Sequence, residues 1–438
     1  MRHHDALHKI NQAWETKAGK LDLSSMGLKF IPGEIGMLTH LEILDVSVNE
    51  LENLPQELQK LSQLKRLFLT KNKFKIWPGE IFHLSSLEML SLKSNSITSI
   101  PETDYLPRHM NWLILTDNLI ESLPENFGFV VSGVKKLALS GNRLESLPAS
   151  FSQLSQLELV RLSNNKFVTF PPQVLNLPKL AWVSLGGNPC SENEPLGVKA
   201  HEALESLCYK REDFIRGEIL GTGASGTVHL ARSPRFPQET LALKVFKAVT
   251  SDGKPEDELM VAVLASSGLT VPEGLIPFRG WTPYPELSLI MDYIPGVEPL
   301  GNPPSLDSIT RDCYSENWTI SWDSLLRILV TLARVQKYLG EKKICHGDFY
   351  AHNILFDQTS QVWLGDWGAS FFYERNEHIF EKFEVRAFGY LAQELVMRTT
   401  NLKPGKLEPL IQDCLNLNPR DRPNFQSLAR FLQNLLDS

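Results

Sequence analysis

The sequence predicts a two-domain chain of the α/β plus α+β class, in which an N-terminal repeat solenoid precedes a second, non-repetitive domain. Three observations support this prediction. A pattern of leucines and asparagines recurs about every 23 residues through the first half of the chain. A glycine-rich loop then leads into a segment with the residues of a β-strand. Finally, histidine, aspartate and asparagine residues lie close together in the second half of the chain, before a further Asp-Trp-Gly sequence.

The length and composition fit a folded chain of more than one domain. The 438 residues include 42% hydrophobic and 22% charged residues, which are ordinary values for globular proteins. The net charge of −7, without any basic run, argues against nucleic acid as a partner.

The sequence also gives expectations about location and thiols. The segment from Met1 to Asp5 has no apolar core, and no run of roughly 18 apolar residues occurs. We therefore expect no signal peptide, no membrane insertion and a cytoplasmic chain. The five scattered cysteines form no C-x-x-C pair, so we expect five free thiols that are mostly buried.

The repeat is clearest around Leu44, Val46, Asn49 and Leu51. Its asparagine returns in step through the first half, and Leu21, Leu23 and Met26 form an imperfect first copy, giving about eight repeats. The later asparagines are Asn72, Asn95, Asn118, Asn142, Asn165 and Asn188. Residues 17–190 thus resemble the leucine-rich-repeat family, and the resemblance implies a horseshoe-shaped solenoid.

Each repeat asparagine has two interpretations, a ligand contact or a structural ladder, and the ladder is strongly favoured because the amide can bond backbone groups where the strand turns. We expect a protein substrate or regulator on the concave face instead. The residues expected there include Asp45, Ser47, Phe68, Thr70, Ser91, Lys93, Ile114, Thr116, Arg161 and Ser163. The oligomeric state is left open.

Helical spacing marks both ends of the solenoid. Residues 1–16 are expected to form a cap helix through Leu7, Ile10 and Trp14, and residues 191–213 a C-terminal cap or linker. Within that linker, Ala200, Leu204 and Leu207 share one helical face. His4 and His8 lie one helical turn apart, where a solvated helix face is favoured over a metal site.

The second domain, residues 214–438, begins with a loop containing Gly221, Gly223 and Gly226. A Rossmann dinucleotide loop would open a helix, but here Val228 and its neighbours read as a strand. A second strand-like run carries Ala242 and Lys244. We expect a helix to follow, which carries Glu256 and Glu258.

A second motif runs from His346 through Asp348 to Asn353, and a polar turn later comes Asp366. We read residues 354–365 as a hairpin, which brings Asn353 and Asp366 together at its open end. Their oxygens suit a hard cation such as magnesium.

These motifs together resemble the protein kinase family over residues 214–438, so that the chain resembles a leucine-rich-repeat serine/threonine protein kinase with a short bilobal kinase-like fold. The resemblance implies ATP and Mg²⁺ as cofactors, with Asn353 and Asp366 as metal ligands and Asp348 as the catalytic base. It also implies that Lys244 and Glu258 are catalytic and form an ion pair, with Glu256 as the alternative acid. The nucleotide is then expected against Gly221, Gly223, Gly226, Val228, Ala242, Lys244, Met291 as gatekeeper and the backbone near Tyr293.

The chain departs from the family at several positions. Gly347 replaces an arginine that in many kinases pairs with an activation-loop phosphate, and Tyr350 replaces a lysine near the transferred phosphoryl group. Trp367 replaces a phenylalanine. The segment between Asp366 and Glu384 is short and contains no Ala-Pro-Glu, the motif whose glutamate pairs with the counterpart of Arg422 in the family.

Three functions remain open on the sequence alone. The favoured one is an active protein kinase whose repeats recruit a substrate or regulator. The second is a pseudokinase or scaffold that binds ATP without turnover. The third is a small-molecule phosphotransferase, against which the glycine loop and Arg422 argue.

Overall fold

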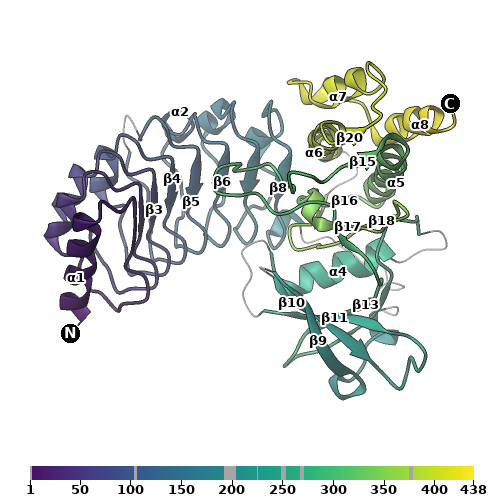
Figure 1. The fold of residues 1–438 in the computed structure, drawn as a ribbon, viewed down its shortest axis with the longest axis horizontal. Helices are drawn as coiled ribbons and strands as arrows, with labels where there is room; N and C mark the ends of the chain where they lie inside the picture. Colours follow the sequence, from purple (N-terminus) through teal and green to yellow (C-terminus); the bar gives the residue numbers. More distant parts are fainter. Residues whose placement is uncertain are drawn as a thin grey trace. The chain divides into compact units, whose positions relative to one another are not determined.

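The computed structural model describes residues 2–102, 106–191, 204–223, 225–247, 253–266, 271–373 and 378–438. Contacts divide the chain into two compact units, Met1–Leu180 and Ala181–Ser438. Figure 1 shows a run of parallel strands in the first half of the chain, and an antiparallel sheet with a group of helices in the second. The predicted fold class is therefore confirmed.

The first unit is a parallel sheet of very short strands arranged in chain order. The strands are β1 (Lys20–Asp22), β2 (Ile43–Asp45), β3 (Arg66–Phe68), β4 (Met89–Ser91), β5 (Trp112–Ile114), β6 (Lys136–Ala138) and β7 (Leu159–Arg161). The next strand along the chain is β8 (Trp182–Ser184), which follows the division between the units. The central residue of each repeat strand is leucine or valine and is aligned with its counterparts, as Leu44 is with Leu67. These side chains stack into one continuous apolar column.

The repeat asparagines form the predicted backbone ladder. Asn49 accepts the backbone N–H groups of Met26 and Leu28 and donates to the oxygens of Leu23 and Val46, and the later asparagines repeat this pattern. The sequence pattern did not show that the residue before the asparagine adopts a left-handed conformation, as at Val48, Lys71, Ser94, Asp117, Gly141 and Asn164. The asparagine amide bonds the backbone groups that this tight turn exposes.

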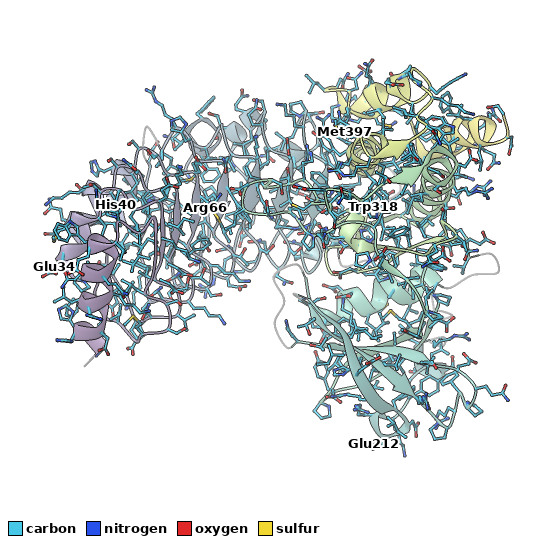
Figure 2. The ribbon with its side chains drawn as sticks, viewed as in Figure 1. Glu34, His40, Arg66, Glu212, Trp318 and Met397 are labelled. Carbon is cyan, nitrogen blue, oxygen red and sulfur yellow. The ribbon has the colours of Figure 1, made fainter. Side chains whose placement is uncertain are left out.

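The return arcs of the repeats are short helices, most of which begin directly after a proline. They are η1 (Gly33–Met37), η2 (Gln56–Lys60), η3 (Gly79–His83), α2 (Phe127–Val130), η4 (Ala149–Gln153) and η5 (Pro172–Val174). Proline fits the position before a helix because the N–H group that it lacks would have no hydrogen-bond acceptor there. Figure 2 labels Glu34 in η1 and Arg66 on β3.

The N-terminal helix α1 (Arg2–Glu15) contacts β1 and η1, as expected of a cap. Its buried residues are Ala6, Ile10 and Ala13, whereas Trp14 is 50% exposed. The buried face of the helix therefore passes through Ala13 and not, as expected, through Trp14. His4 and His8 are both exposed.

The end of the expected C-terminal linker belongs to the second unit. The backbone of Leu207 and Tyr209 bonds to Trp281, and Trp281 Nε1 donates to the oxygen of Leu204. This short stretch thus lies along the edge of the second unit's sheet. Ala200 lies outside the described residues.

The second unit begins with β8 and η6 (Pro189–Ser191) and contains a five-stranded antiparallel sheet. In the order β12-β13-β11-β10-β9, its strands are β12 (Phe278–Thr282), β13 (Ser288–Asp292), β11 (Leu241–Phe246), β10 (Gly226–Arg232) and β9 (Ile215–Thr222). The turn η7 (Arg211–Asp213) precedes β9, and α4 (Pro255–Ser266) lies against this sheet (Figure 1).

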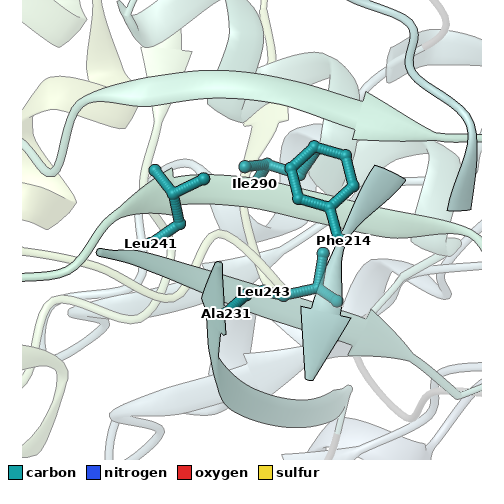
Figure 3. Packing of buried hydrophobic residues seen from close by; sticks show 5 residues of the cluster. All are labelled: Phe214, Ala231, Leu241, Leu243 and Ile290. Carbon is teal, nitrogen blue, oxygen red and sulfur yellow. The ribbon is translucent and has the colours of Figure 1, made fainter. Parts of the chain in front are cut away.

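Successive side chains along β11 point to opposite faces of this sheet. Leu241 and Leu243 pack with Phe214, Ala231 and Ile290 in one apolar core (Figure 3). The intervening side chains of β11 therefore point to the opposite face, which carries the site described below.

The remaining part of the second unit is mainly helical. Its helices are α5 (Trp322–Glu341), α6 (Ile379–Val396), α7 (Glu408–Cys414) and α8 (Phe425–Leu436), with the turns η8 (Ala351–Asn353) and η9 (Pro419–Asp421). Its strands are β14 (Glu298–Pro299), β15 (Ile320–Ser321), β16 (Ile344–Cys345), β17 (Ile354–Phe356), β18 (Val362–Leu364), β19 (Phe371–Phe372) and β20 (Thr399–Thr400). Helix α5 packs against α8 and α6, and Met397 directly after α6 is exposed (Figure 2).

All five cysteines are free, as predicted. The expectation that they are mostly buried was wrong, because only Cys345 and Cys414 are buried, while Cys208 is exposed. Cys208 lies in the stretch along the sheet edge, where side chains alternate between the sheet and solvent.

Candidate active site

A cavity of about 460 Å³ lies between the antiparallel sheet and the helical part of the second unit. All the residues expected around a nucleotide line it, namely Gly221, Gly223, Gly226, Val228, Ala242, Lys244, Met291 and Tyr293. Glu258, Asn353 and Asp366 line it as well. Gly221 and Asp366 are far apart in the sequence, so only the fold brings these lining residues together.

The glycine loop joins β9 and β10 over this cavity. Gly223 N donates to the oxygen of Gly226, and a Cβ on Gly226 would lie 2.5 Å from the backbone oxygen of Val245. Gly226 is therefore required by its neighbours. At Gly221 and Gly223 a Cβ would meet nothing within 4 Å, so these two glycines leave open space for a ligand.

Lys244 lies on the cavity face of β11 and joins two acids from different elements. Its Nζ forms a close ion pair with Glu258 of α4 and lies 3.2 Å from Asp366 Oδ1. Burial opposes the charged form, but Asp366 and Glu258 outweigh it and raise the pKa of Lys244. Lys244 in turn lowers the pKa of the Asp366 carboxyl group. The alternative acid Glu256 instead accepts a hydrogen bond from Tyr284.

The catalytic loop, defined here as residues His346–Asn353, connects β16 to β17. Asn353 Nδ2 donates to the backbone oxygen of Asp348 at 2.9 Å and to its Oδ2 at 3.0 Å. His346 Nε2 lies 3.0 Å from the oxygen of Gly365. Asp348 and Asn353 are therefore held as one unit beside the start of the Asp366 segment.

Strands β17 and β18 form the predicted hairpin, with Ile354 paired to Leu364 and Gly365 N donating to the oxygen of Asn353. Asp366 follows directly in a left-handed conformation, with φ of 57°. This conformation is costly for a residue with a side chain and is found at functional sites held by their surroundings. The hairpin thus places Asn353 and Asp366 at the same end of the cavity.

The donor set fits a nucleotide with a divalent metal ion. Asn353 and Asp366 supply amide and carboxylate oxygens, the ligands preferred by hard cations. Among the described residues, no group of three or more His, Cys, Asp or Glu is placed to hold a metal by itself. A metal at this site would therefore complete its coordination with phosphate and water oxygens, as magnesium commonly does.

The buried carboxylate of Glu384 on α6 accepts a hydrogen bond from the catalytic loop. Glu384 Oε1 accepts from Gly347 N at 2.8 Å and from Cys345 Sγ at 3.1 Å, and Gln336 donates to Oε2. Glu384 is 3% exposed, and this burial raises the pKa of its carboxyl group. Sequence reasoning used Glu384 only as a landmark, because its contacts join segments about 40 residues apart.

Sequence reasoning also missed His352, which lines the cavity. His352 Nδ1 lies 2.7 Å from Asp312 Oδ1, and its backbone N–H donates to the other oxygen of that carboxylate. No local pattern around Asp312 announces this pair.

The departures from the family have structural explanations. Trp367 is buried, and its ring lies 5.2 Å from the ring of His346. Arg422 donates to the backbone oxygens of Asn416 and Lys382 at 2.9 Å, and burial followed by the charge of Arg386 lowers its pKa to about 9. Backbone carbonyls therefore take the place of the missing glutamate around Arg422.

No helix in the described ranges combines the length and apolar character needed to cross a membrane.

Comparison with known proteins assigns both parts of the chain. A leucine-rich-repeat region matches residues 20–106, a leucine-rich-repeat model matches residues 108–167 and 132–190, and the protein kinase domain model matches residues 214–406.

Relatives of the chain include two plant receptor kinases. The lectin-domain containing receptor kinase VI.3 of Arabidopsis thaliana is 29% identical over 189 residues, which cover 42% of this chain and 26% of that protein. The L-type lectin-domain containing receptor kinase VI.2 of the same plant is 30% identical with the same coverage. The matched part therefore spans about a quarter of these relatives. The repeats, the cavity geometry and the matches together establish that this chain is a fusion of a leucine-rich-repeat region with a protein kinase domain.

Proposed function

We propose that the chain is an ATP- and Mg²⁺-dependent protein kinase that transfers the γ-phosphoryl group to a serine or threonine hydroxyl of a protein substrate. The observation that carries this proposal is the bridge from Glu258 through Lys244 to Asp366, which lies in one cavity with Asn353. A buried cation held by two carboxylates is preorganised to position phosphates.

Each polar residue has a distinct part in this mechanism. Lys244 binds phosphate oxygens of the nucleotide, and Glu258 keeps its ammonium group oriented. Asp348, oriented by Asn353, accepts the proton of the acceptor hydroxyl as its oxygen attacks the γ-phosphorus and the bond to the β-phosphate oxygen breaks. Asn353 and Asp366 would hold magnesium, which would supply charge neutralisation for the phosphates.

The test uses the full chain with γ-labelled ATP and Mg²⁺, a generic protein substrate and the native substrate once identified. Asp348→Asn keeps the hydrogen-bonding shape and removes the base, so phosphate transfer should fall by about 10²-fold or more. Nucleotide binding, followed as the thermal shift on adding Mg-ATP, should persist in both proteins. Equal transfer by wild type and variant refutes the proposal. A thermal shift without any transfer supports the scaffold function, and transfer only to small hydroxyl compounds supports the phosphotransferase.

We also propose that the repeats recruit the protein substrate or a regulator through their concave face. Phe68 on β3 and Ile114 on β5 are half-buried there and offer apolar contact area, whereas Ser91, Thr116 and Ser163 are buried. The three buried residues were expected on this face but contribute little surface. Recruitment would raise the local substrate concentration at the catalytic site.

Phe68→Ala together with Ile114→Ala in the full chain tests recruitment. Phosphorylation of the native substrate should fall, while phosphorylation of a short generic peptide stays at the wild-type rate. An equal fall for both substrates argues against recruitment.

A further inference from the structure

The second unit begins with β8, and β8 contacts the catalytic loop. Trp182 Nε1 donates to the backbone oxygen of Phe349 at 3.0 Å. The Trp182 ring also stacks on Tyr350, with 4.3 Å between ring centroids and 5° between the ring planes. Phe349 and Tyr350 directly follow Asp348, so both contacts fix the backbone next to the proposed base.

This stack is part of a larger buried group. Trp182 is 2% exposed and also lies 5.5 Å from the ring of Tyr390 on α6. The guanidinium group of Arg311 lies 3.5 Å from the centre of the Tyr390 ring and 5.3 Å from that of Trp182. Tyr350 continues the series toward His352, at 5.1 Å. Trp182 is therefore the central ring between α6 and the catalytic loop.

The backbone of β8 explains why position 347 is a glycine. With φ of +74°, Gly347 has a conformation that favours glycine, and a Cβ there would lie 2.4 Å from the oxygen of Val183 and 2.6 Å from that of Ala369. Ser370 Oγ in addition donates to the oxygen of His346 at 2.9 Å. The first half of the catalytic loop is thus enclosed between β8 and residues 369–370, and an arginine side chain has no place at position 347.

We infer that Trp182 is a positioning residue that holds Asp348 in place through its contacts with Phe349 and Tyr350. This inference rests on the proposed kinase function for its kinetic consequence, although the ordering of the loop stands on the contacts alone. Tyr350 and Gly347, the two departures next to Asp348, are both parts of this arrangement.

The kinetic test compares Trp182→Phe and Trp182→Ala in the full chain with Trp322→Phe as the matched control. Trp322 is 4% exposed at the start of α5, and Lys403 lies over its ring at 5.9 Å, so Trp322→Phe should keep the wild-type kcat. Trp182→Ala should lower kcat by about 10²-fold, the size expected from displacing a catalytic group by about 1 Å. Trp182→Phe retains a stacking ring and loses the hydrogen bond to Phe349, so its kcat should be intermediate. KM for ATP should not change, because Trp182 does not line the nucleotide cavity.

The structural test needs no turnover. Hydrogen exchange of the peptide covering residues 345–353 should become about tenfold faster in Trp182→Ala, as expected from the loss of a stacked pair and a hydrogen bond. Exchange in α8 should not change. Unchanged exchange at 345–353 in both Trp182 variants overturns the inference, as does acceleration spread evenly over the second unit.

The two proposals fail in different ways. Absent turnover in the wild type, combined with faster exchange of the catalytic loop in Trp182→Ala, rejects the kinase function and keeps the positioning role. Unchanged kcat in Trp182→Ala rejects the positioning role and keeps the kinase function.

Discussion

A Cβ atom on Gly347 would lie 2.4 Å from the backbone oxygen of Val183, so the catalytic loop and β8 are in contact through their backbones. This contact is possible only because position 347 has no side chain. It also means that position 347 cannot hold the arginine found in many kinases without moving one of the two segments.

Gly347→Ala should therefore cost both conformational strain and a steric clash. We expect a loss of about 3 kcal/mol in the free energy of unfolding, combining the left-handed conformation with overpacking. Gly405 is the matched control, because its φ is +76° but a Cβ atom there would have no neighbour within 4 Å. Gly405→Ala should cost about 1 kcal/mol. Equal losses in urea unfolding would show that the clash with Val183 is absent in solution.

The ion pair between Lys244 and Glu258 should show strong coupling in stability. Lys244→Met leaves the carboxylate of Glu258, which is 3% exposed, without this cation, and should cost about 3 kcal/mol or more. Adding Glu258→Leu removes the buried charge, so the double variant should be more stable than Lys244→Met alone. A double-mutant cycle from urea unfolding measures this, and additive effects would contradict the coupling.

The raised pKa of Glu394 predicts that the stability of the chain depends on pH. Burial, followed by the charge of Asp312, raises its pKa to about 7 from 4.5, while Tyr314 donates to its Oε2. Between pH 4.5 and 7 the folded chain keeps a proton that the unfolded chain has released, so this group's contribution to stability is present at low pH and is lost as the pH rises through about 7. The contribution is on the order of 3 kcal/mol.

Glu394→Gln should remove this part of the pH dependence. The difference in unfolding free energy between wild type and variant should change between pH 5 and pH 8 in favour of the variant. A difference that is constant over this range would mean that Glu394 titrates normally in the folded chain.

The asparagine ladder should be most sensitive where it is buried. Asn118 is 4% exposed, accepts from Ile97 N and donates to the oxygens of Leu92 and Leu115. Asn118→Ala should cost about 3 kcal/mol, because buried backbone groups lose their partners. Asn95 makes the same bonds but is partly exposed, so water can replace its amide, and Asn95→Ala should cost about 1 kcal/mol. Thermal unfolding of the two variants tests the order, and equal shifts would contradict it.

Most residues of the cavity were predictable from the sequence. The glycine loop, Lys244, Asn353 and Asp366 were predicted to act together, and the structure brings them into one cavity. Glu258 was chosen over Glu256 from the expected helix, and it is Glu258 that pairs with Lys244. These predictions were possible because each motif is local, with fixed spacing along a strand, a helix or a hairpin.

The sequence by itself determined the repeats and the order of the kinase motifs, because periodic apolar residues and short-range spacings specify their own local structure. Only the tertiary structure decided that Trp182 stacks on Tyr350, that His352 pairs with Asp312 and that Leu207 and Tyr209 bond to Trp281. The rotation of the N-terminal helix, which exposes Trp14, was likewise decided by packing. Such contacts join residues that are distant in the chain, as Trp182 and Phe349 are, and no local pattern encodes which distant surfaces come together.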